Sequence, residues 1–115
     1  MTPIQYQECI EACIECMNAC NLSYVSSLKE YNLELLRDAI RMDRECADIC
    51  GFAIQAMTRQ SPFVAEICRL CAEICEACAE VCSRSVHTHC QNCIEACQKC
   101  AEVCRQVSKA VAVYA

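Results

Sequence analysis

Apolar side chains recur at every third or fourth position along almost the whole chain, with charged and amide side chains between them. This spacing places one apolar stripe along an α-helix. One Gly and two Pro are too few for a turn-rich all-β fold. The pattern therefore predicts four helices, over residues about 4–27, 33–59, 63–84 and 90–112.

Short polar segments separate the predicted helices. Asn32 is placed to cap the second helix. Before the third helix, Ser61 would be the N-cap and Pro62 the first helical residue. The last connection, 83–89, is rich in Ser, Thr and His. Because short connections make neighbouring helices antiparallel, we predict an all-α fold, an up-down-up-down four-helix bundle forming a single domain over residues 1–115.

Cysteine occupies the inward stripe of three of the four predicted helices. Its steps alternate between three and four residues, as the a and d positions of a coiled coil do. On the first helix, Glu8, Glu11 and Glu15 fall on the opposite face, so the thiols should form a cysteine-lined core and the carboxylates should face water. The three stripes are Cys9, Cys13, Cys16 and Cys20; Cys68, Cys71, Cys75, Cys78 and Cys82; and Cys90, Cys93, Cys97, Cys100 and Cys104.

The second predicted helix differs, because only Cys46 and Cys50 bring thiols to its inward stripe. It adds a thioether from Met42 and a carboxylate from Asp43. The other positions that we place on this stripe are Leu35, Ala39, Ala53 and Met57.

Composition and charge exclude several classes of partner. The net charge is −5, Trp is absent and Lys and Arg do not cluster, so we expect neither nucleic acid nor an anionic membrane surface. No stretch approaches about 18 uninterrupted apolar residues, so no membrane span is expected. The first residues show neither the basic segment nor the apolar core of a secretory signal. This favours the cytoplasm, where thiols are kept reduced.

The chain has 16 cysteines in 115 residues, and cysteine is too small for three such stripes to fill an ordinary core. Metal would fill the space, because thiolates bind Cu(I), Zn²⁺ and iron–sulfur clusters. Four Zn²⁺ on 16 thiolates would leave 16 − 8 = 8 negative charges inside the bundle. Bridging Cu(I) ions approach one per thiolate and leave the core nearly neutral. Straight helices without a Cys-Pro pair disfavour iron–sulfur clusters. We therefore predict multiple Cu(I) ions on the sixteen thiolates.

Three short motifs and the two five-cysteine stripes add a further signal. The motifs are Cys-Ile-Glu-Ala-Cys-Ile-Glu-Cys-Met-Asn-Ala-Cys at 9–20, Asp-Arg-Glu-Cys-Ala-Asp-Ile-Cys at 43–50 and Ser-Pro-Phe at 61–63. Together they resemble the cysteine-rich four-helix-bundle copper storage proteins, in particular the cytosolic branch. The resemblance spans nearly the whole chain. It implies storage of many Cu(I) ions inside one bundle and a homo-oligomer, a tetramer in this family.

The chain departs from this family pattern near the turn between the first two helices. Ser23, Ser27 and Ala39 lie on inward stripes where close relatives tend to have cysteine. A serine hydroxyl is a poor ligand for Cu(I). We therefore expect a lower copper capacity than in the most cysteine-rich members of the family.

Four other residues are candidates for admitting metal at one end of the bundle: His87, His89, Met42 and Asp43. Imidazole, thioether and carboxylate could exchange Cu(I) before it moves inward. The alternatives are that the histidines are solvated in an exposed loop and that Met42 only fills the core. Asp43 could instead pair with Arg44 or a helix terminus.

Catalysis finds little support, because nucleophile-elbow, phosphate-loop and zinc-protease motifs are absent. We expect a copper storage or sequestration protein and no enzyme. Two alternatives stay open: a zinc or mixed soft-metal, metallothionein-like detoxification protein, and a thiol redox or stress sensor. The expected partners are copper ions, with copper chaperones or small thiols as donors.

Overall fold

The computed structural model describes the backbone of residues 6–114 and the side chains of residues 6–111. It contains four α-helices and, within the described residues, no strand. The helices are α1 (Gln7–Leu28), α2 (Leu33–Thr58), α3 (Val64–Cys82) and α4 (Thr88–Tyr114). The four-helix prediction is confirmed, while the predicted helical residues 4 and 5 lie outside the described part of the chain.

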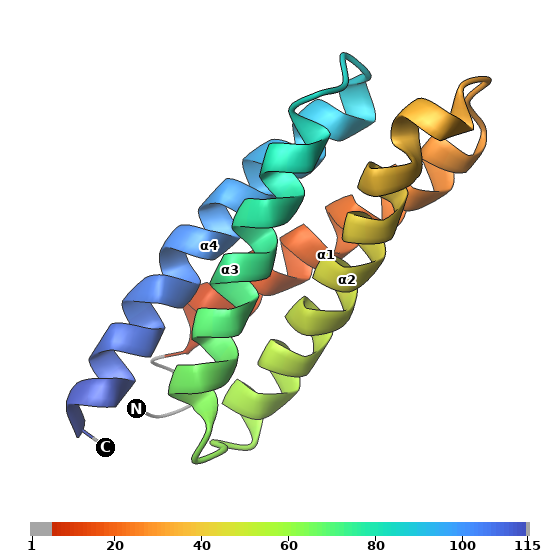
Figure 1. The fold of residues 1–115 in the computed structure, drawn as a ribbon. Coiled ribbons are helices and arrows are strands. Elements are labelled where there is room, and N and C mark those ends of the chain that lie inside the picture. The colour runs from red at the N-terminus through yellow and green to blue at the C-terminus, as the bar shows by residue number, and fades with distance from the viewer. Residues whose placement is uncertain (1–5, 115) are drawn as a thin grey trace.

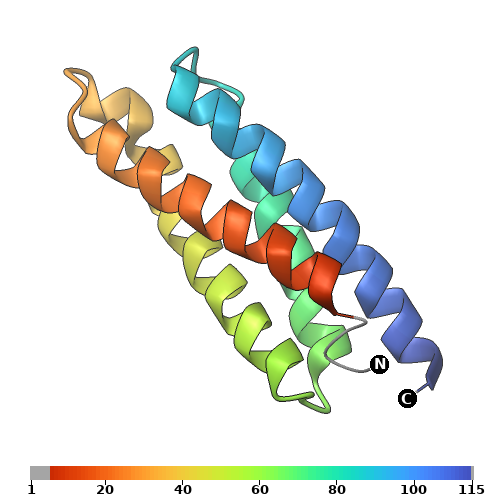
Figure 2. The same cartoon turned by 180° about the vertical axis from the view of Figure 1, so that it is seen from behind.

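The helices form an antiparallel bundle in which successive helices run up and down (Figure 1). Contacts join α1 to α2, α2 to α3, α3 to α4 and α4 back to α1, so the four helices enclose one axis. The molecule is a rod with extents of 49 × 18 × 17 Å. Seen from behind, α1 begins and α4 ends at the end that also holds the α2–α3 turn (Figure 2).

The two ends of the rod differ in chemistry. We call the end with the α2–α3 turn the terminal end, where the core is closed by Tyr6, Met57, Val64 and Val107, each at most 6% exposed. The opposite end holds the α1–α2 turn and the α3–α4 connection, which contains His87. We call it the histidine end.

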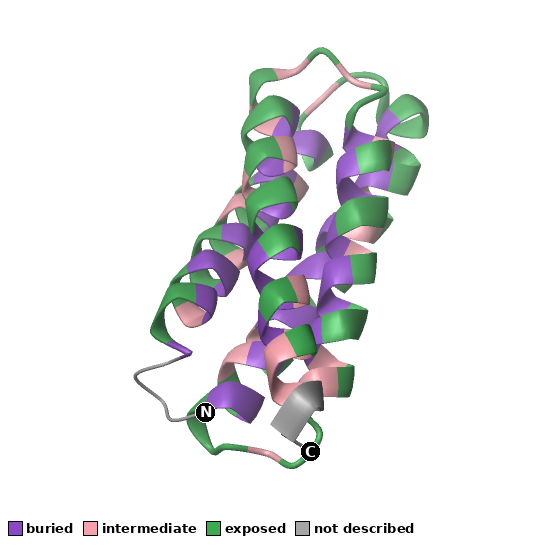
Figure 3. Cartoon of the chain, turned by 90° about the vertical axis from the view of Figure 1, so that its left-hand side faces the viewer, coloured by how far each residue is buried: buried purple, intermediate pink, exposed green. Residues whose placement is uncertain are grey.

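Each helix buries one stripe and exposes the rest, as Figure 3 shows by the buried residues along the inner faces. On α2 the predicted stripe needs one correction, because Leu35 is 82% exposed and Leu36 is buried. From Asp43 the buried positions step back by four residues to Ala39 and then by three to Leu36. A second step of four, to Leu35, would carry the stripe away from the axis.

Helix α3 begins later than the Ser61-Pro62 signal predicts. Ser61 Oγ accepts a hydrogen bond from the backbone N–H of Phe63 at 3.1 Å, as a capping side chain would. However, the Val64 N–H bonds to the Ser61 carbonyl at 3.3 Å, a tighter turn than α-helix. The regular helix α3 therefore begins at Val64.

The starts of α2 and α4 also differ in detail from the prediction. Asn32 occupies the N-cap position of α2, but its side chain makes no capping hydrogen bond. Helix α4 begins at Thr88, two residues before the predicted start, and its first turn therefore includes His89.

Helix α2 ends in a Schellman motif built on a residue other than glycine. The Ser61 N–H bonds to the Ala56 carbonyl at 2.9 Å and the Gln60 N–H to the Met57 carbonyl at 3.1 Å. This geometry requires Gln60 to adopt φ = 55°, in the left-handed region. Glycine reaches this conformation without the steric cost that a side chain adds.

The substitution Gln60→Gly should stabilise the copper-free, reduced protein. We expect a gain of about 0.5–1 kcal/mol in the free energy of unfolding, because relief of left-handed strain exceeds the added freedom of the unfolded chain. Urea unfolding followed by circular dichroism measures it. Gln60→Ala is the matched control and should give no gain, and equal effects of both substitutions would contradict this explanation.

Candidate metal centre

All sixteen cysteines are buried and none forms a disulfide in the structure. Cys9 is 1% exposed and the other fifteen are 0% exposed. The alternating three- and four-residue steps explain this, because they keep each thiol on the helix face toward the bundle axis. The structure thus brings together every cysteine that the sequence placed in the core.

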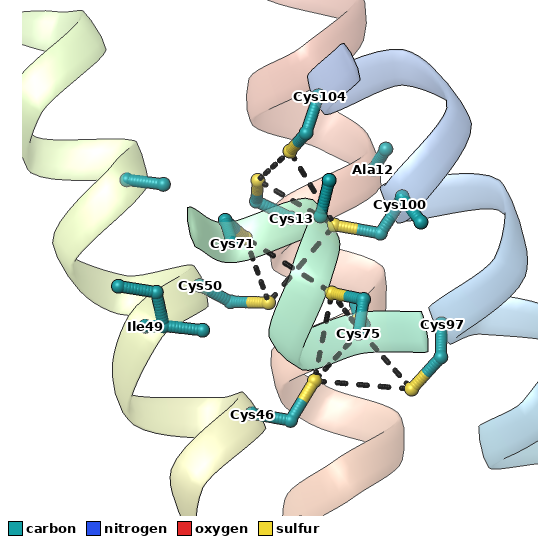
Figure 4. Close-up of a cluster of buried hydrophobic side chains, with 14 of the residues drawn as sticks. Ala12, Cys13, Cys46, Ile49, Cys50, Cys71, Cys75, Cys97, Cys100 and Cys104 are labelled. Carbon is teal, nitrogen blue, oxygen red and sulfur yellow. Dashed lines mark hydrogen bonds between the residues drawn. The ribbon is translucent and has the colours of Figure 1, made fainter. Parts of the chain in front are cut away.

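Sulfur–sulfur contacts join all four helices near the middle of the bundle. Cys16 Sγ lies 3.7 Å from Cys46 Sγ of α2 and 3.7 Å from Cys97 Sγ of α4. Cys75 of α3 completes the set, with its Sγ 3.6 Å from that of Cys46. Figure 4 shows Cys46, Cys75 and Cys97 turned toward one another from three helices.

The contacts continue in both directions along the axis. Toward the terminal end, Cys104 Sγ lies 3.5 Å from Cys9 Sγ and 3.7 Å from Cys13 Sγ. Toward the histidine end, Cys20 Sγ lies 3.6 Å from Cys93 Sγ. Apart from Cys68 and Cys90, the thiols are therefore linked into a continuous sulfur column rather than isolated pairs.

Within the column, several sets of four Sγ atoms lie within 4.8 Å of one another. Cys16 and Cys46 belong both to a set with Cys50 and Cys75 and to a set with Cys20 and Cys97. Such overlap suits ions that share ligands, because one thiolate can bridge two monovalent cations.

Neighbouring thiols shift each other's pKa in opposite directions. Hydrogen bonds with Cys16 and Cys20 lower the pKa of the Cys46 thiol, against the effect of burial. Hydrogen bonds with Cys16 and Cys46 raise the pKa of the Cys20 thiol, and burial adds to the rise. The thiols therefore share protons, and full ionisation requires cations that replace those protons.

Asp43 lies inside the column at the histidine end and is 0% exposed. Cys93, Cys78 and Cys82 donate their S–H groups to Asp43 Oδ1 at 3.3, 3.5 and 3.7 Å. Burial, and then the charge of Cys93, raise the pKa of the carboxyl to about 8. The carboxyl of Asp43 is therefore a common hydrogen-bond acceptor for three thiols at this end.

The alternative pairing of Asp43 with Arg44 is wrong. Arg44 points outward and forms an ion pair with Asp48 at 2.6 Å, one helical turn along α2. It also donates a hydrogen bond to Asn21 at 3.3 Å. Adjacent helical positions differ by about 100° in direction, so Arg44 leaves the axis that Asp43 faces.

The two histidines occupy different environments. His89 is only 14% exposed at its side chain, and its Nδ1 lies 3.4 Å from Ser23 Oγ and 3.5 Å from Cys90 Sγ. His87 is 39% exposed and stacks on the His89 ring with centroids 5.2 Å apart. The alternative that both histidines are solvated in an exposed loop is therefore wrong for His89. It describes His87 only in part, because that ring stacks on His89.

This end also holds Met42 and three core positions that lack cysteine. Met42 is half-buried and packs against the core, in agreement with a core-filling role. Ser23 and Ser27 are 0% exposed and Ala39 is 4% exposed, so the inward placement predicted for these three positions is confirmed. They give this end of the core hydroxyl and methyl groups in place of thiols.

Glu30 is a residue that sequence reasoning missed. It lies in the α1–α2 turn, and its Oε1 faces both histidine rings. No spacing rule could have found it, because almost sixty residues separate Glu30 from His87 along the chain.

The part of the chain that the structure describes contains no helix long and apolar enough to cross a membrane. This result agrees with the sequence, in which no stretch approaches about 18 uninterrupted apolar residues.

Comparison with known proteins supports a metal role for the sulfur column. A sequence profile described as copper storage protein matches residues 3–109. A cysteine-rich protein of Bacillus subtilis, YhjQ, described as uncharacterized, is 54% identical over 86 residues, which cover 74% of this chain and 80% of that protein.

Two solved structures are similar over most of their length. The Cu(I)-bound copper storage protein BsCsp3 is 52% identical, with a TM-score of 0.87 over 90% of this chain and 97% of that chain. A cytosolic copper storage protein from Streptomyces lividans, in a copper-loading state with five coppers, is 30% identical. Its TM-score is 0.88 over 93% of this chain and 94% of that chain.

The raised pKa of Asp43 should make the copper-free, reduced protein less stable as pH rises from about 4 to 8. Over this range the native carboxyl keeps a proton that the unfolded chain has lost, so the unfolded state binds fewer protons and stability falls. Asp43→Asn should flatten this slope, as measured by urea unfolding at several pH values. Asp48→Asn, on the exposed face, is the control, and an unchanged slope in Asp43→Asn would refute the assignment.

Proposed function

The chain belongs to the copper storage protein family, and on this basis we propose that it holds many Cu(I) ions on thiolates inside its bundle. The observation that supports this most directly is the sulfur column, with overlapping sets of four buried Sγ atoms from different helices. Storage inside one bundle requires such a continuous set of ligands, whereas a single structural or catalytic ion would need only one set.

Charge balance supports Cu(I) over Zn²⁺ as the cargo. Four Zn²⁺ on 16 thiolates leave a net charge of −8 in a core that excludes water, which is costly. One Cu(I) per thiolate leaves the core neutral, and bridging thiolates satisfy the two or three ligands that each Cu(I) takes. We infer a capacity on the order of one Cu(I) per cysteine.

The ligands in this proposal are all sixteen cysteines, with uptake at the histidine end. Asp43 accepts hydrogen bonds from three thiols there, and His89 contacts Cys90. We infer that an incoming Cu(I) first meets His87 or His89 and then exchanges onto Cys90. Met42 supplies a thioether next to Asp43 in the sequence.

The proposal extends to location and assembly. We infer a cytoplasmic protein, in line with its likeness to a cytosolic relative, which receives copper from chaperones or small thiols and catalyses no reaction. We also infer a homo-oligomer, a tetramer by family resemblance. Exposed apolar side chains on α1 and α2 support an assembly, among them Leu22 at 61%, Val25 at 48% and Phe52 at 46% exposure.

Anaerobic titration of the reduced protein with Cu(I), against a competing Cu(I) chelator, tests the storage function. We expect saturation at roughly one ion per cysteine, read as the metal-to-protein ratio after gel filtration. Saturation at one or two ions would refute storage and favour a chaperone or sensor. Preferential loading of a few Zn²⁺ in a mixed titration would instead support the metallothionein-like alternative.

Replacing one thiol in the column should remove only part of the capacity. Cys97 belongs to overlapping sets, so Cys97→Ala should lower the Cu(I) stoichiometry by only a few ions as neighbouring thiolates take over its bridges. Ser27→Ala, which removes a fully buried hydroxyl near the histidine end, is the control and should keep the full capacity. Complete loss of binding in Cys97→Ala would indicate a single discrete site.

A further inference from the structure

A cavity of about 190 Å³ opens at the histidine end, between the start of α2 and the α3–α4 connection. Leu36, which is 3% exposed, lines it together with the exposed apolar side chains of Leu35 and Val86. Its polar lining includes the guanidinium of Arg84 and the imidazole of His87. Among the described residues no cysteine lines it, so the cavity is separate from the sulfur column.

The cavity adjoins a smaller one of about 40 Å³, with which it shares Leu35, Leu36 and Arg84. We call the two together the rim pocket. The smaller cavity adds the carboxylate of Asp38, whereas no described residue that lines the larger one is acidic. Apolar carbon with one cation and one anion suits a small zwitterionic ligand that carries a carboxylate.

The guanidinium of Arg84 is available to bind an anion. It forms an ion pair with Glu80, one helical turn earlier, at 3.9 Å, and the two side chains are 63% and 71% exposed. An exposed pair at this distance contributes little stability, so a ligand carboxylate can replace Glu80 at little cost. A carboxylate in the rim pocket can accept two parallel N–H hydrogen bonds from the guanidinium, which is a stronger arrangement.

Backbone hydrogen bonds hold the wall of the rim pocket that carries Arg84. Beyond the last turn of α3, the Arg84 N–H bonds to the Val81 carbonyl at 3.3 Å, and the Ser85 N–H bonds to the Cys82 carbonyl at 3.1 Å. Ser85 Oγ in turn accepts a hydrogen bond from the His87 N–H at 3.2 Å. The wall is therefore formed before a ligand arrives, which lowers the entropy cost of binding.

The rim pocket lies one helical turn from the first thiol of α4. His87 lines the pocket, and the Cys90 N–H donates a hydrogen bond to the His87 carbonyl at 3.0 Å. A ligand in the pocket that carries Cu(I) on a sulfur atom would therefore release the ion beside the place at which copper uptake is proposed.

We propose that the rim pocket binds the small thiol that carries Cu(I) to the protein, an amino-acid or short-peptide thiol with free carboxylate and ammonium groups. Arg84 pairs with the carboxylate and Asp38 with the ammonium group. Leu35 and Val86 cover the carbon chain. This inference rests on the proposed copper storage and adds to it a site that recognises the carrier.

The transfer of copper from the carrier is a ligand exchange in which no atom is oxidised or reduced. A bond forms between Cu(I) and Cys90 Sγ while the bond between Cu(I) and the carrier sulfur breaks. The proton of the Cys90 thiol passes to the released carrier thiolate, so atoms and charge balance. The carrier then leaves the rim pocket as a free thiol.

S-methylglutathione tests recognition of the carrier without copper transfer, because its sulfur is blocked. It is titrated into the reduced, copper-free protein while the NMR shifts of the backbone amides are followed. We expect saturable shifts in residues 32–38 and 84–87. Arg84→Gln should weaken this binding at least about tenfold, because it removes a charge-assisted pair of hydrogen bonds. Leu35→Glu, which adds a carboxylate at an exposed position of the lining, should also weaken it.

Two controls separate recognition in the rim pocket from a general effect of charge. Arg69→Gln removes the same charge from an exposed position near the other end of α3 and should bind S-methylglutathione as the wild type does. The diamide of S-methylglutathione, in which both carboxylates are amidated, should bind the wild type at least about tenfold more weakly than the parent compound.

The rate of copper loading supplies a second readout. Cu(I) is added anaerobically as its glutathione complex or as its acetonitrile complex, which has no carboxylate, and the luminescence of Cu(I)–thiolate follows loading. At sub-saturating concentrations, Arg84→Gln should slow loading from glutathione about tenfold. The rate from acetonitrile and the final copper-to-protein ratio should equal those of the wild type.

Binding of S-methylglutathione that Arg84→Gln and amidation both weaken, with slower loading from glutathione alone, supports the proposal. Absence of saturable shifts, equal binding by wild type and Arg84→Gln, or equal loading rates from glutathione in these two proteins would each overturn it. Failure of copper storage is read separately, from a final ratio of only one or two ions, because that ratio does not depend on the rim pocket.

Discussion

Contact between sulfur atoms along the bundle axis is the interaction on which the rest of the structure depends. Thiols from four helices approach to 3.5–4.0 Å, and each is held there by its place on a three-and-four spacing. Such a column tolerates protons or cations but not sixteen uncompensated charges. The outer faces, the closed terminal end and the polar histidine end surround this core. Its charge must be balanced by protons or cations that come from outside the bundle.

The sequence predicted the helices and the inward thiols because both depend on a local period. Any helix that carries Cys68, Cys71 and Cys75 must place them on one face, whatever surrounds it. The same reasoning placed Asp43 inside correctly. It was wrong for Leu35, because a stripe with only two cysteines leaves the choice between steps of three and four open near the start of α2.

The details that the sequence could not show are contacts between segments far apart in the chain. Ser23 meets His89, and Glu30 meets both histidines, across more than fifty residues. The Schellman motif at Gln60 was also hidden, because glycine is the usual signal for that conformation and the chain has only one glycine, elsewhere. Packing geometry rather than periodicity decides such features.

The apolar closure at the terminal end has a consequence for the order in which stored ions are loaded and released. Met57 and Val64 are fully buried there. In the proposed function, Cu(I) therefore enters and leaves through the opposite end alone. A core with one opening fills and empties in a fixed order. The ions that enter first lie deepest and leave last. The freshest copper would then be the most readily withdrawn, and the deepest ions would form a slow reserve.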